Sequence, residues 1–226
     1  MIVPINGVLD AATARQYKDL VEQGELQDGK ITAGGLAGQV KANQQLRDDS
    51  ETAMRLGSQL VRIMRSLPLF VSAALPRHIF PPKFNCYQDG GHYGLHVDSS
   101  IMHLPNSAMM RTDISATLFL SGSEDYDGGE LCIETQYGAQ EVKLDAGDLI
   151  LYPSTSLHEV KPVTSGARIC AFFWIESLVR DNSKRELLFD LDQSIQQLTL
   201  DRGAADQEVR RLSGIYHNLL RTWASS

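Results

Sequence analysis

The sequence predicts a mainly β fold with flanking helices, in which a double-stranded β-helix (jelly roll) lies between N-terminal helices and a C-terminal helical hairpin. Short runs of alternating apolar and polar residues, separated by turn residues, fill positions 83–176. Before and after this region, apolar residues recur at helical spacing. We therefore expect an N-terminal helical region with a lid loop over 1–77, the jelly roll over 78–177 and the hairpin over 178–226.

Eight candidate strands make up the predicted jelly roll. Turns rich in glycine, such as Asp89-Gly90-Gly91 and Asp127-Gly128-Gly129, separate several of them. Many short strands at regular spacing are typical of a double-sheet jelly roll. The runs are KFNCYQ, YGLHVD, ISATLFLS, GELCIE, QEVKL, DLILYP, HEVKPV and ARICAFFWI.

Helices are predicted on both sides of the strands. Asp10 and Ser50 are suitable N-caps for two N-terminal helices. Between these helices, residues 31–46 show no clear period, and we expect a long mobile loop that acts as a lid. Two apolar stripes after Asn182 predict a hairpin of helices. This hairpin could pack on the jelly roll or form a homodimer with a second subunit.

Composition excludes several classes of function. The 226 residues carry a formal net charge of -7 without a Lys/Arg run, so nucleic acid is not an expected partner. The longest apolar run, 169–175, is too short to span a membrane, and the N-terminus lacks a signal-peptide pattern. We expect a cytoplasmic protein with no membrane partner. The three cysteines, Cys86, Cys132 and Cys170, each lie in a strand-like run and are interpreted as reduced core residues.

Three residues form a candidate metal site. His96 and Asp98 stand two apart in an extended run, so both side chains point to one face. His158 begins a strand about sixty residues later. Two histidines and one carboxylate form a facial triad with open positions, a pattern typical of non-heme Fe(II) oxygenases. The alternative is that all three are polar residues that cap turns at strand ends.

Arg168 begins the strand after that of His158, and we expect a hairpin to bring the two residues side by side. It shares its strand face with Cys170, Phe172 and Trp174, which directs a guanidinium into an apolar interior. Buried arginine needs an anionic partner, and no acidic residue lies beside it in the sequence. The partner is either a ligand or a remote carboxylate of the protein.

The order of these residues in a jelly roll resembles the Fe(II)/2-oxoglutarate dioxygenases, particularly the prolyl and lysyl hydroxylase-like branch. The strings FNCYQDGGHYGLHVD, RTDISATLFLS, YDGGEL, GDLILYPSTSLHEV and LLFDLDQSIQQL are most similar to the bacterial PKHD-type hydroxylases, a group associated with iron uptake loci. This resemblance covers nearly the whole chain.

The resemblance implies a chemistry and a set of roles. His96, Asp98 and His158 would bind Fe(II), and Arg168 would pair with the far carboxylate of 2-oxoglutarate. With O2, the cosubstrate would yield succinate and CO2 while the substrate is hydroxylated, and L-ascorbate would serve as reductant. A family tyrosine near position 87 contacts the cosubstrate, which suggests Tyr87, with Tyr93 as a second candidate. We expect Tyr87 on a strand next to that of His96, because DGGHYG can form a turn.

Other functions and residues stay open at this stage. The alternatives are a cupin-like metal protein without oxygenase turnover and an iron- or 2-oxoglutarate-sensing module. His92 and His103 flank the motif, and we expect both in loops, where they are solvated. Arg111 is expected to have a surface role. The substrate is a small molecule or a peptidyl group, and the residues do not identify it.

Overall fold

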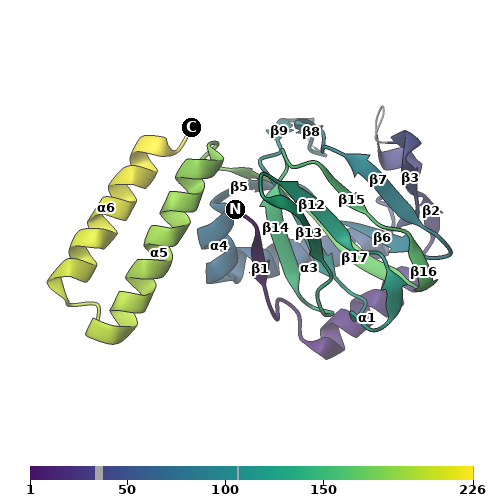
Figure 1. Cartoon of the computed structure of the whole chain (residues 1–226), viewed down its shortest axis with the longest axis horizontal. Helices are drawn as coiled ribbons and strands as arrows, with labels where there is room; N and C mark the ends of the chain where they lie inside the picture. Colours follow the sequence, from purple (N-terminus) through teal and green to yellow (C-terminus); the bar gives the residue numbers. More distant parts are fainter. Residues whose placement is uncertain (34–37, 106, 226) are drawn as a thin grey trace.

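The computed structural model describes residues 1–33, 38–105 and 107–225. Two antiparallel sheets face each other as in a jelly roll, with helices against one sheet and a helical hairpin beside the barrel (Figure 1). The predicted fold class is therefore confirmed. All eight predicted strands form, with ends shifted by a few residues.

The larger sheet has the strand order β1-β14-β10-β17-β6-β4-β2, and β5 also pairs with β17. Its strands are β1 (Val3–Ile5), β2 (Leu26–Asp28), β4 (Gln44–Leu46), β5 (Pro76–Ile79), β6 (Lys83–Tyr87), β10 (Ile114–Phe119), β14 (Leu149–Pro153) and β17 (Arg168–Ser177).

The smaller sheet has the order β13-β12-β15-β7-β3, and two short ribbons, β11-β16 and β8-β9, extend the barrel. These strands are β3 (Lys41–Ala42), β7 (His92–His96), β8 (Ile101–His103), β9 (Met109–Arg111), β11 (Tyr126–Gly128), β12 (Leu131–Thr135), β13 (Gly138–Val142), β15 (His158–Val160) and β16 (Val163–Gly166).

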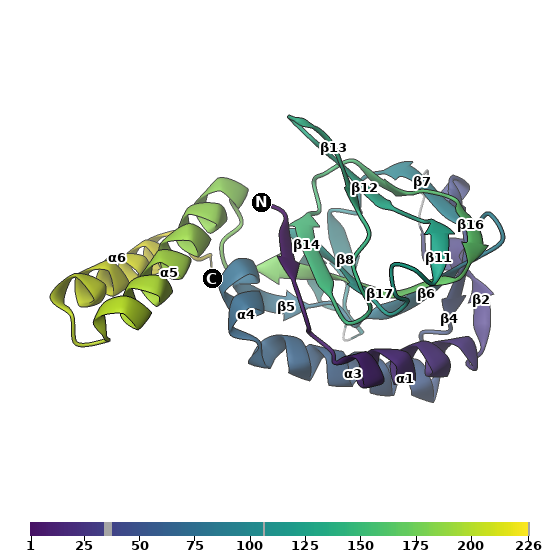
Figure 2. The same ribbon diagram turned by 60° about the horizontal axis from the view of Figure 1, so that its bottom comes forward.

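The helices lie outside the barrel. They are α1 (Ala11–Glu22), the 3-10 helix η1 (Gly29–Thr32), α3 (Glu51–Ser66), α4 (Pro68–Ala74), α5 (Asn182–Arg202) and α6 (Gln207–Trp223). The predicted caps form, since the Asp10 side chain accepts from Thr13 N and the Ser50 hydroxyl accepts from Ala53 N. Figure 2 shows α1 and α3 lying together under the larger sheet.

Two apolar layers stabilise this arrangement. One lies between the larger sheet and α1 and α3, and includes the fully buried Leu60, Met64 and Phe84. The second lies between the sheets and includes Phe119 and Ile133. Burial of each such side chain contributes about 1.5–3 kcal/mol before cavity effects are counted. The larger sheet is thus held rigid from its outer side.

The prediction of a long loop over residues 31–46 is wrong for most of the segment that the structure describes. Five of its last six residues form β3, which pairs with β7, and β4, which pairs with β6. The segment therefore adds one strand to each sheet. Strands of two and three residues are too short to show a period in the sequence. Residues 34–37 lie outside the described residues.

Two predictions of neighbouring strands are also wrong. Tyr87 ends β6 in the larger sheet, whereas His96 ends β7 in the smaller sheet. Likewise, His158 lies in β15 of the smaller sheet and Arg168 in β17 of the larger one. In both cases the chain crosses between facing sheets instead of making a hairpin within one sheet. These residues consequently face each other across the interior.

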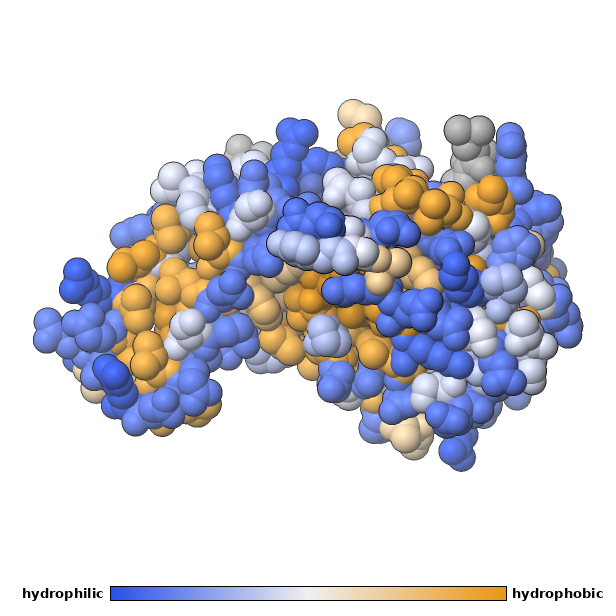
Figure 3. Space-filling view, in the orientation of Figure 1, coloured by the Kyte–Doolittle hydropathy of each residue, from blue (hydrophilic) through white to orange (hydrophobic). Residues whose placement is uncertain are grey.

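The hairpin α5–α6 lies beside α4, where the Ser72 hydroxyl donates to Asp192 Oδ2 at 2.6 Å. Apolar side chains gather on the hairpin surface (Figure 3), and Leu187, Leu200 and Ile215 are among the exposed large ones. The homodimer through these helices stays a prediction.

Within the described ranges, no helix combines the length and apolar character needed to cross a membrane.

Gly129 is required where β11 meets β12. Its φ is +68°, and a Cβ there would lie 2.8 Å from Val163 Cγ2 and 3.1 Å from Arg168 Cδ. Both the left-handed backbone and the close packing favour glycine. The YDGGEL string therefore shapes the wall against which Arg168 lies.

The Gly129→Ala variant is expected to lose about 2–4 kcal/mol of unfolding free energy, since it adds overpacking to left-handed strain. Gly7→Ala is the matched control, because Gly7 has φ +64° with nothing within 4 Å of an added Cβ. That control should show only the smaller backbone cost, about 1 kcal/mol. Urea unfolding of both variants measures the difference, and equal losses would contradict the packing argument.

Candidate active site

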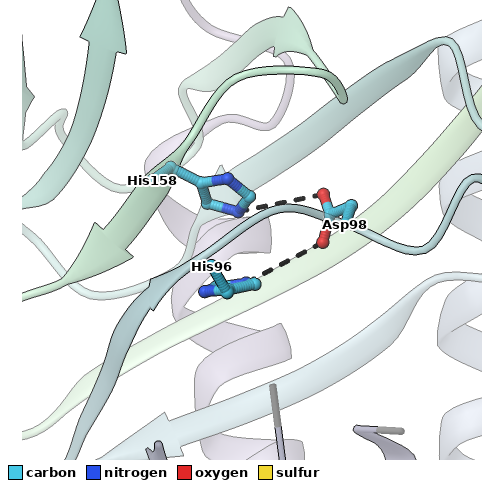
Figure 4. Close-up of side chains that lie close together, drawn as sticks. All are labelled: His96, Asp98 and His158. Carbon is cyan, nitrogen blue, oxygen red and sulfur yellow. Dashed lines mark ion pairs between the residues drawn. The ribbon is translucent and has the colours of Figure 1, made fainter. Parts of the chain in front are cut away.

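Three side chains from the smaller sheet point toward one another inside the barrel (Figure 4). His96 and His158 are direct partners across the β7–β15 pair, and Asp98 follows the end of β7. Asp98 Oδ1 lies 3.9 Å from His96 Nε2, and Asp98 Oδ2 lies 3.8 Å from His158 Nε2. One ligand atom from each residue falls within 4.8 Å of the other two, so a single ion can be held among them.

Backbone carbonyls orient both imidazole rings. His96 Nδ1 lies 2.7 Å from Gly94 O, and His158 Nδ1 lies 3.0 Å from Ser156 O. An Nδ1–H that donates to a carbonyl leaves the Nε2 lone pair free on the side of Asp98. Burial, followed by the neighbouring His158, lowers the pKa of His96 to about 4. The ring is therefore neutral near pH 7, the state in which imidazole binds metals.

Asp98 is held by hydroxyl groups of the larger sheet. The Ser115 hydroxyl donates to Asp98 Oδ2 at 2.5 Å, and it also lies 2.8 Å from the Ser154 hydroxyl. Ser115 belongs to β10, so this contact crosses from one sheet to the other. It fixes the carboxylate in a loop that would otherwise leave it free to rotate.

Arg168 lies in the larger sheet and is 1% exposed. Its guanidinium carbon lies 5.3 Å from the Tyr87 ring centroid and 5.2 Å from that of Phe119. One terminal nitrogen donates to Cys170 Sγ, whereas Nε has no hydrogen-bond partner in the described part of the chain. No carboxylate among the described residues forms an ion pair with it. A buried cation in this state fits an anionic ligand.

Tyr87 is the partner of Arg168 across the β6–β17 pair. Its hydroxyl accepts from Asn85 Nδ2 at 3.0 Å, and burial raises its pKa. The phenol therefore stays protonated and has its own hydrogen left to donate. The site has a second tyrosine, Tyr93, whose ring stacks on His96 with centroids 3.6 Å apart.

One cavity, partly open to solvent and with an accessible volume of about 80 Å³, connects these groups. The histidines and Asp98 line it from the smaller sheet, and Arg168 and Tyr87 line it from the larger sheet. All five predicted site residues therefore lie in the same cavity, as does Tyr93.

The flanking residues lie away from this cluster. His92 Nδ1 lies against Gly90 O, and His103 is exposed. Neither belongs to the metal-ligand group found among the described residues. Arg111 donates twice to Asp113, at 2.7 and 2.9 Å, and Glu176 lies 3.4 Å away. Its guanidinium is engaged in this ion-pair network rather than in the cavity.

Sequence reasoning missed several polar residues that line the cavity, among them Ser115, Thr117 and Lys41. Ser115 and Thr117 alternate on the inner face of β10, and polar residues at alternate positions of an apolar strand were a usable signal. Lys41 lies in the two-residue strand β3 and gave no such signal.

The residues fit Fe(II) and 2-oxoglutarate. Two neutral imidazoles and a carboxylate are a donor set that suits ferrous iron and leaves positions open. Arg168 is buried with no hydrogen-bond partner for its Nε among the described residues, and it lies in the same cavity as the three donors. A dicarboxylate that reaches from the metal to Arg168 would satisfy both ends.

The Ser115→Ala variant is expected to bind Fe(II) about 10- to 100-fold more weakly, because Asp98 loses the donor that orients it. Ser121→Ala is the control, since the Ser121 hydroxyl donates to Ala167 O away from the cluster. Titration of the apo proteins with Fe(II) without oxygen measures the affinities. Equal Fe(II) affinity in Ser115→Ala and the parent protein would show that the hydroxyl does not orient the ligand.

Comparison with known proteins agrees with this site. Residues 82–176 match the model of the 2OG-Fe(II) oxygenase superfamily, and residues 182–225 match the PKHD-type hydroxylase C-terminal domain. Fold and site thus define a 2-oxoglutarate-dependent dioxygenase. A PKHD-type hydroxylase of Pseudoalteromonas atlantica is 56% identical over 226 residues, with all of both chains covered. The chain belongs to the PKHD-type hydroxylases.

Solved structures share the fold. A prolyl hydroxylase from Trichoplax adhaerens, in complex with a peptide fragment of a hypoxia inducible factor, superposes with a TM-score of 0.58 at 17% identity over 83% of this chain and 86% of that one. A prolyl-4-hydroxylase from Pseudomonas putida gives 0.56 at 19% identity over 78% and 92%. At these identities the likeness concerns the fold alone.

Proposed function

We propose that this enzyme hydroxylates an amino-acid-like or peptidyl substrate, with Fe(II), 2-oxoglutarate and O2, and releases succinate and CO2. One observation carries the proposal: the His96–Asp98–His158 cluster and Arg168, which has no carboxylate partner among the described residues, lie in one cavity, on facing sheets. When bound, iron and cosubstrate supply the oxidative chemistry that inserts oxygen into a C–H bond.

The residues of the chain have distinct tasks in this reaction. His96, His158 and Asp98 hold the metal, while Gly94 O and Ser156 O keep the imidazole Nε2 atoms unprotonated. Arg168 binds the far carboxylate of 2-oxoglutarate in a water-poor pocket between two aromatic rings, and Tyr87 donates its hydroxyl hydrogen toward the cosubstrate. Together they fix the cosubstrate before the reaction starts.

The substrate class rests on two supports. Both solved relatives above are described as prolyl hydroxylases, one of them with a bound peptide. The cavity is also open to solvent and carries apolar side chains, including Met102, Phe172 and Trp174, that could receive an amino-acid side chain.

Our proposal includes a link to iron homeostasis, L-ascorbate as reductant and a cytoplasmic location, where buried thiols such as Cys86 stay reduced.

The central test uses purified protein without oxygen. Addition of Fe(II) and 2-oxoglutarate is expected to give a visible charge-transfer band, and admission of O2 should yield succinate and labelled CO2 from 1-¹⁴C-2-oxoglutarate. Absence of both in protein shown to contain iron would overturn the proposal.

The substrate is sought in a strain from which the gene has been deleted, grown with and without iron. We expect a metabolite or peptide that gains one oxygen atom when the gene is restored, and mass spectrometry detects this gain. If the compound changes equally under both iron conditions, the link to iron homeostasis is wrong, whereas the hydroxylase proposal stands.

A further inference from the structure

The hairpin α5–α6 has more apolar surface than the rest of the chain covers. Its attached end is held through Leu188 and Trp223, which pack with Leu75 and Val179. A second set of apolar side chains on both helices belongs to none of the buried clusters in the described part of the chain. This set, the hairpin stripe, consists of Leu187, Leu191, Ile195 and Leu198 of α5 and Leu212 and Ile215 of α6.

The hairpin stripe faces solvent in the single chain. Its members on α5 recur at every third or fourth position, so they lie along one side of that helix. Leu187 is 60% exposed and Ile215 is 43% exposed, and the other members are partly exposed. Figure 3 shows apolar surface that continues across both helices and has hydrophilic side chains at its border. An apolar face of this kind is normally covered by a further layer of structure.

The size of this face suits a second copy of the hairpin. At a rise of about 1.5 Å per residue, α5 with 21 residues is about 31 Å long and α6 with 17 residues is about 25 Å long. Two helices of this length, each about 10 Å wide, give a face of about 500 Å² in projection, and the accessible area of a ridged face is larger. A stable interface starts at about 600 Å² per partner. Two stacked hairpins therefore have enough area to form a four-helix bundle.

The position of the barrel determines how two hairpins can stack. Figure 1 shows α5 next to α4 and the barrel, with α6 on the outer side. A twofold axis parallel to the helices places the second barrel on the opposite side of the bundle, where both barrels have room. A twofold axis across the helices would bring both barrels to the same side. The first arrangement sets α5 of each copy antiparallel to α6 of the other, with both hairpin loops at one end.

Charges on the two helices are complementary in this arrangement. Asp190 and Asp201 of α5 are exposed, as are Arg210 and Arg221 of α6. With the loops at one end, Asp201 lies level with Arg210 of the second copy, and Asp190 lies level with Arg221. Among the described residues, none of these four side chains forms an ion pair within the chain. Opposite charges at matching heights favour this register over others.

We propose that the protein forms a homodimer in which two hairpins build an antiparallel four-helix bundle, with α5 of each copy against α6 of the other. The hairpin stripes meet in the centre of this bundle, and the charged pairs lie at its rim. None of the described hairpin residues lines the cavity with the metal cluster, so this inference is independent of the proposed function.

Sedimentation equilibrium of the full chain at micromolar concentration tests the dimer. The parent protein is expected to have twice the mass of one chain. Leu187→Asp and Ile215→Asp each place a charge in the centre of the interface and should raise the dimer Kd at least about 100-fold. Both residues are exposed in the single chain, so the fold should be unaffected. Met54→Asp is the matched control, because Met54 is 57% exposed on α3, outside the hairpin, and this variant should dimerise like the parent protein.

Charge reversal tests which helices meet. Asp190→Arg places an arginine level with Arg221 of the second copy, and Arg221→Asp places an aspartate level with Asp190. Each single variant should raise the dimer Kd about tenfold through repulsion of like charges. The double variant exchanges the two charges and should return the Kd to within about threefold of the parent value. Far-ultraviolet circular dichroism should show the same helix content in every variant.

Three results would overturn the inference. A parent protein that sediments as a single chain, or as three or more chains, is not the proposed homodimer. An unchanged dimer Kd in Leu187→Asp and Ile215→Asp excludes the hairpin stripe as the interface. A double charge variant that dimerises no better than the two single variants excludes the contact of α5 with α6 of the second copy.

Discussion

Asp98→Ala is expected to lower Fe(II) affinity by at least about 100-fold and to abolish succinate formation, because the cluster loses its one anionic ligand. Two neutral imidazoles remain, and they cannot offset the charge of the ion. Iron content after dialysis and the charge-transfer band with 2-oxoglutarate measure the loss.

Asp98→Asn separates charge from shape at the same position. It keeps an oxygen that accepts from Ser115 but removes the negative charge. We expect it to lose most of the iron affinity as well. Asp127→Ala, on the exposed part of β11, removes an equal charge elsewhere and should bind iron normally. If Asp98→Ala retains iron and turnover, Asp98 is a polar residue at a strand end and not a ligand.

Much of the barrel could be predicted because its central strands are long enough to show alternation. Runs such as ISATLFLS and ARICAFFWI repeat the pattern over several residues, and both form central strands of the larger sheet. Three-residue strands such as β1 and β8 contain too few positions for a period. They form because neighbouring strands supply their hydrogen bonds, which the local sequence does not encode.

The connection between strands could not be predicted in the same way. The turn after Tyr87 and the segment between His158 and Arg168 contain ordinary turn residues, which serve equally in a hairpin and in a crossing between sheets. In this protein both segments cross. The error concerned the path of the chain between strands. The prediction that Tyr87, His96, His158 and Arg168 face one interior does not depend on that path.

The candidate site could be predicted where residue type and strand position coincide. His96, Asp98 and His158 have metal-ligand chemistry at strand ends, and Arg168 is a cation on an apolar face, so each is unusual in its own segment. Ser115 is ordinary in its segment. Its importance comes from a contact with Asp98 across the barrel, 17 positions away in sequence, and only the packed structure brings the two together.

The structure also divides the work of the site between its two sheets. The smaller sheet provides the metal ligands, and the larger sheet, packed against α1 and α3, provides Arg168 and Tyr87. The distance between metal and arginine is therefore set by the core that holds the sheets apart. A cosubstrate of fixed length needs such a rigid spacing.

Arg168→Met is expected to retain iron but to lose about 100-fold or more in 2-oxoglutarate affinity, because a buried carboxylate would have lost its charged partner. Met fills much of the space between the rings of Tyr87 and Phe119, so the change removes charge more than volume. Titration of the anaerobic Fe(II) protein with 2-oxoglutarate, followed by its visible band, gives the affinity.

Arg111→Met is the matched control for this loss. It also removes one guanidinium charge, but from a side chain that is paired with Asp113. The 2-oxoglutarate affinity of this control should stay near that of the parent protein. The 2-oxoglutarate affinity of Arg168→Lys should lie between those of Arg168→Met and the parent protein, since lysine restores the charge but cannot form two parallel hydrogen bonds to a carboxylate.

Stability distinguishes the ligand role of Arg168 from a structural one. If the guanidinium stabilised the fold through a remote carboxylate, its removal would leave that anion buried and cost about 3–5 kcal/mol. The described residues offer Arg168 no such partner. We therefore expect the unfolding free energy of Arg168→Met, measured with urea, to differ from that of the parent protein by less than about 1 kcal/mol. A large loss of stability with unchanged 2-oxoglutarate affinity would make this arginine structural, and the cosubstrate would then need another anchor in the cavity.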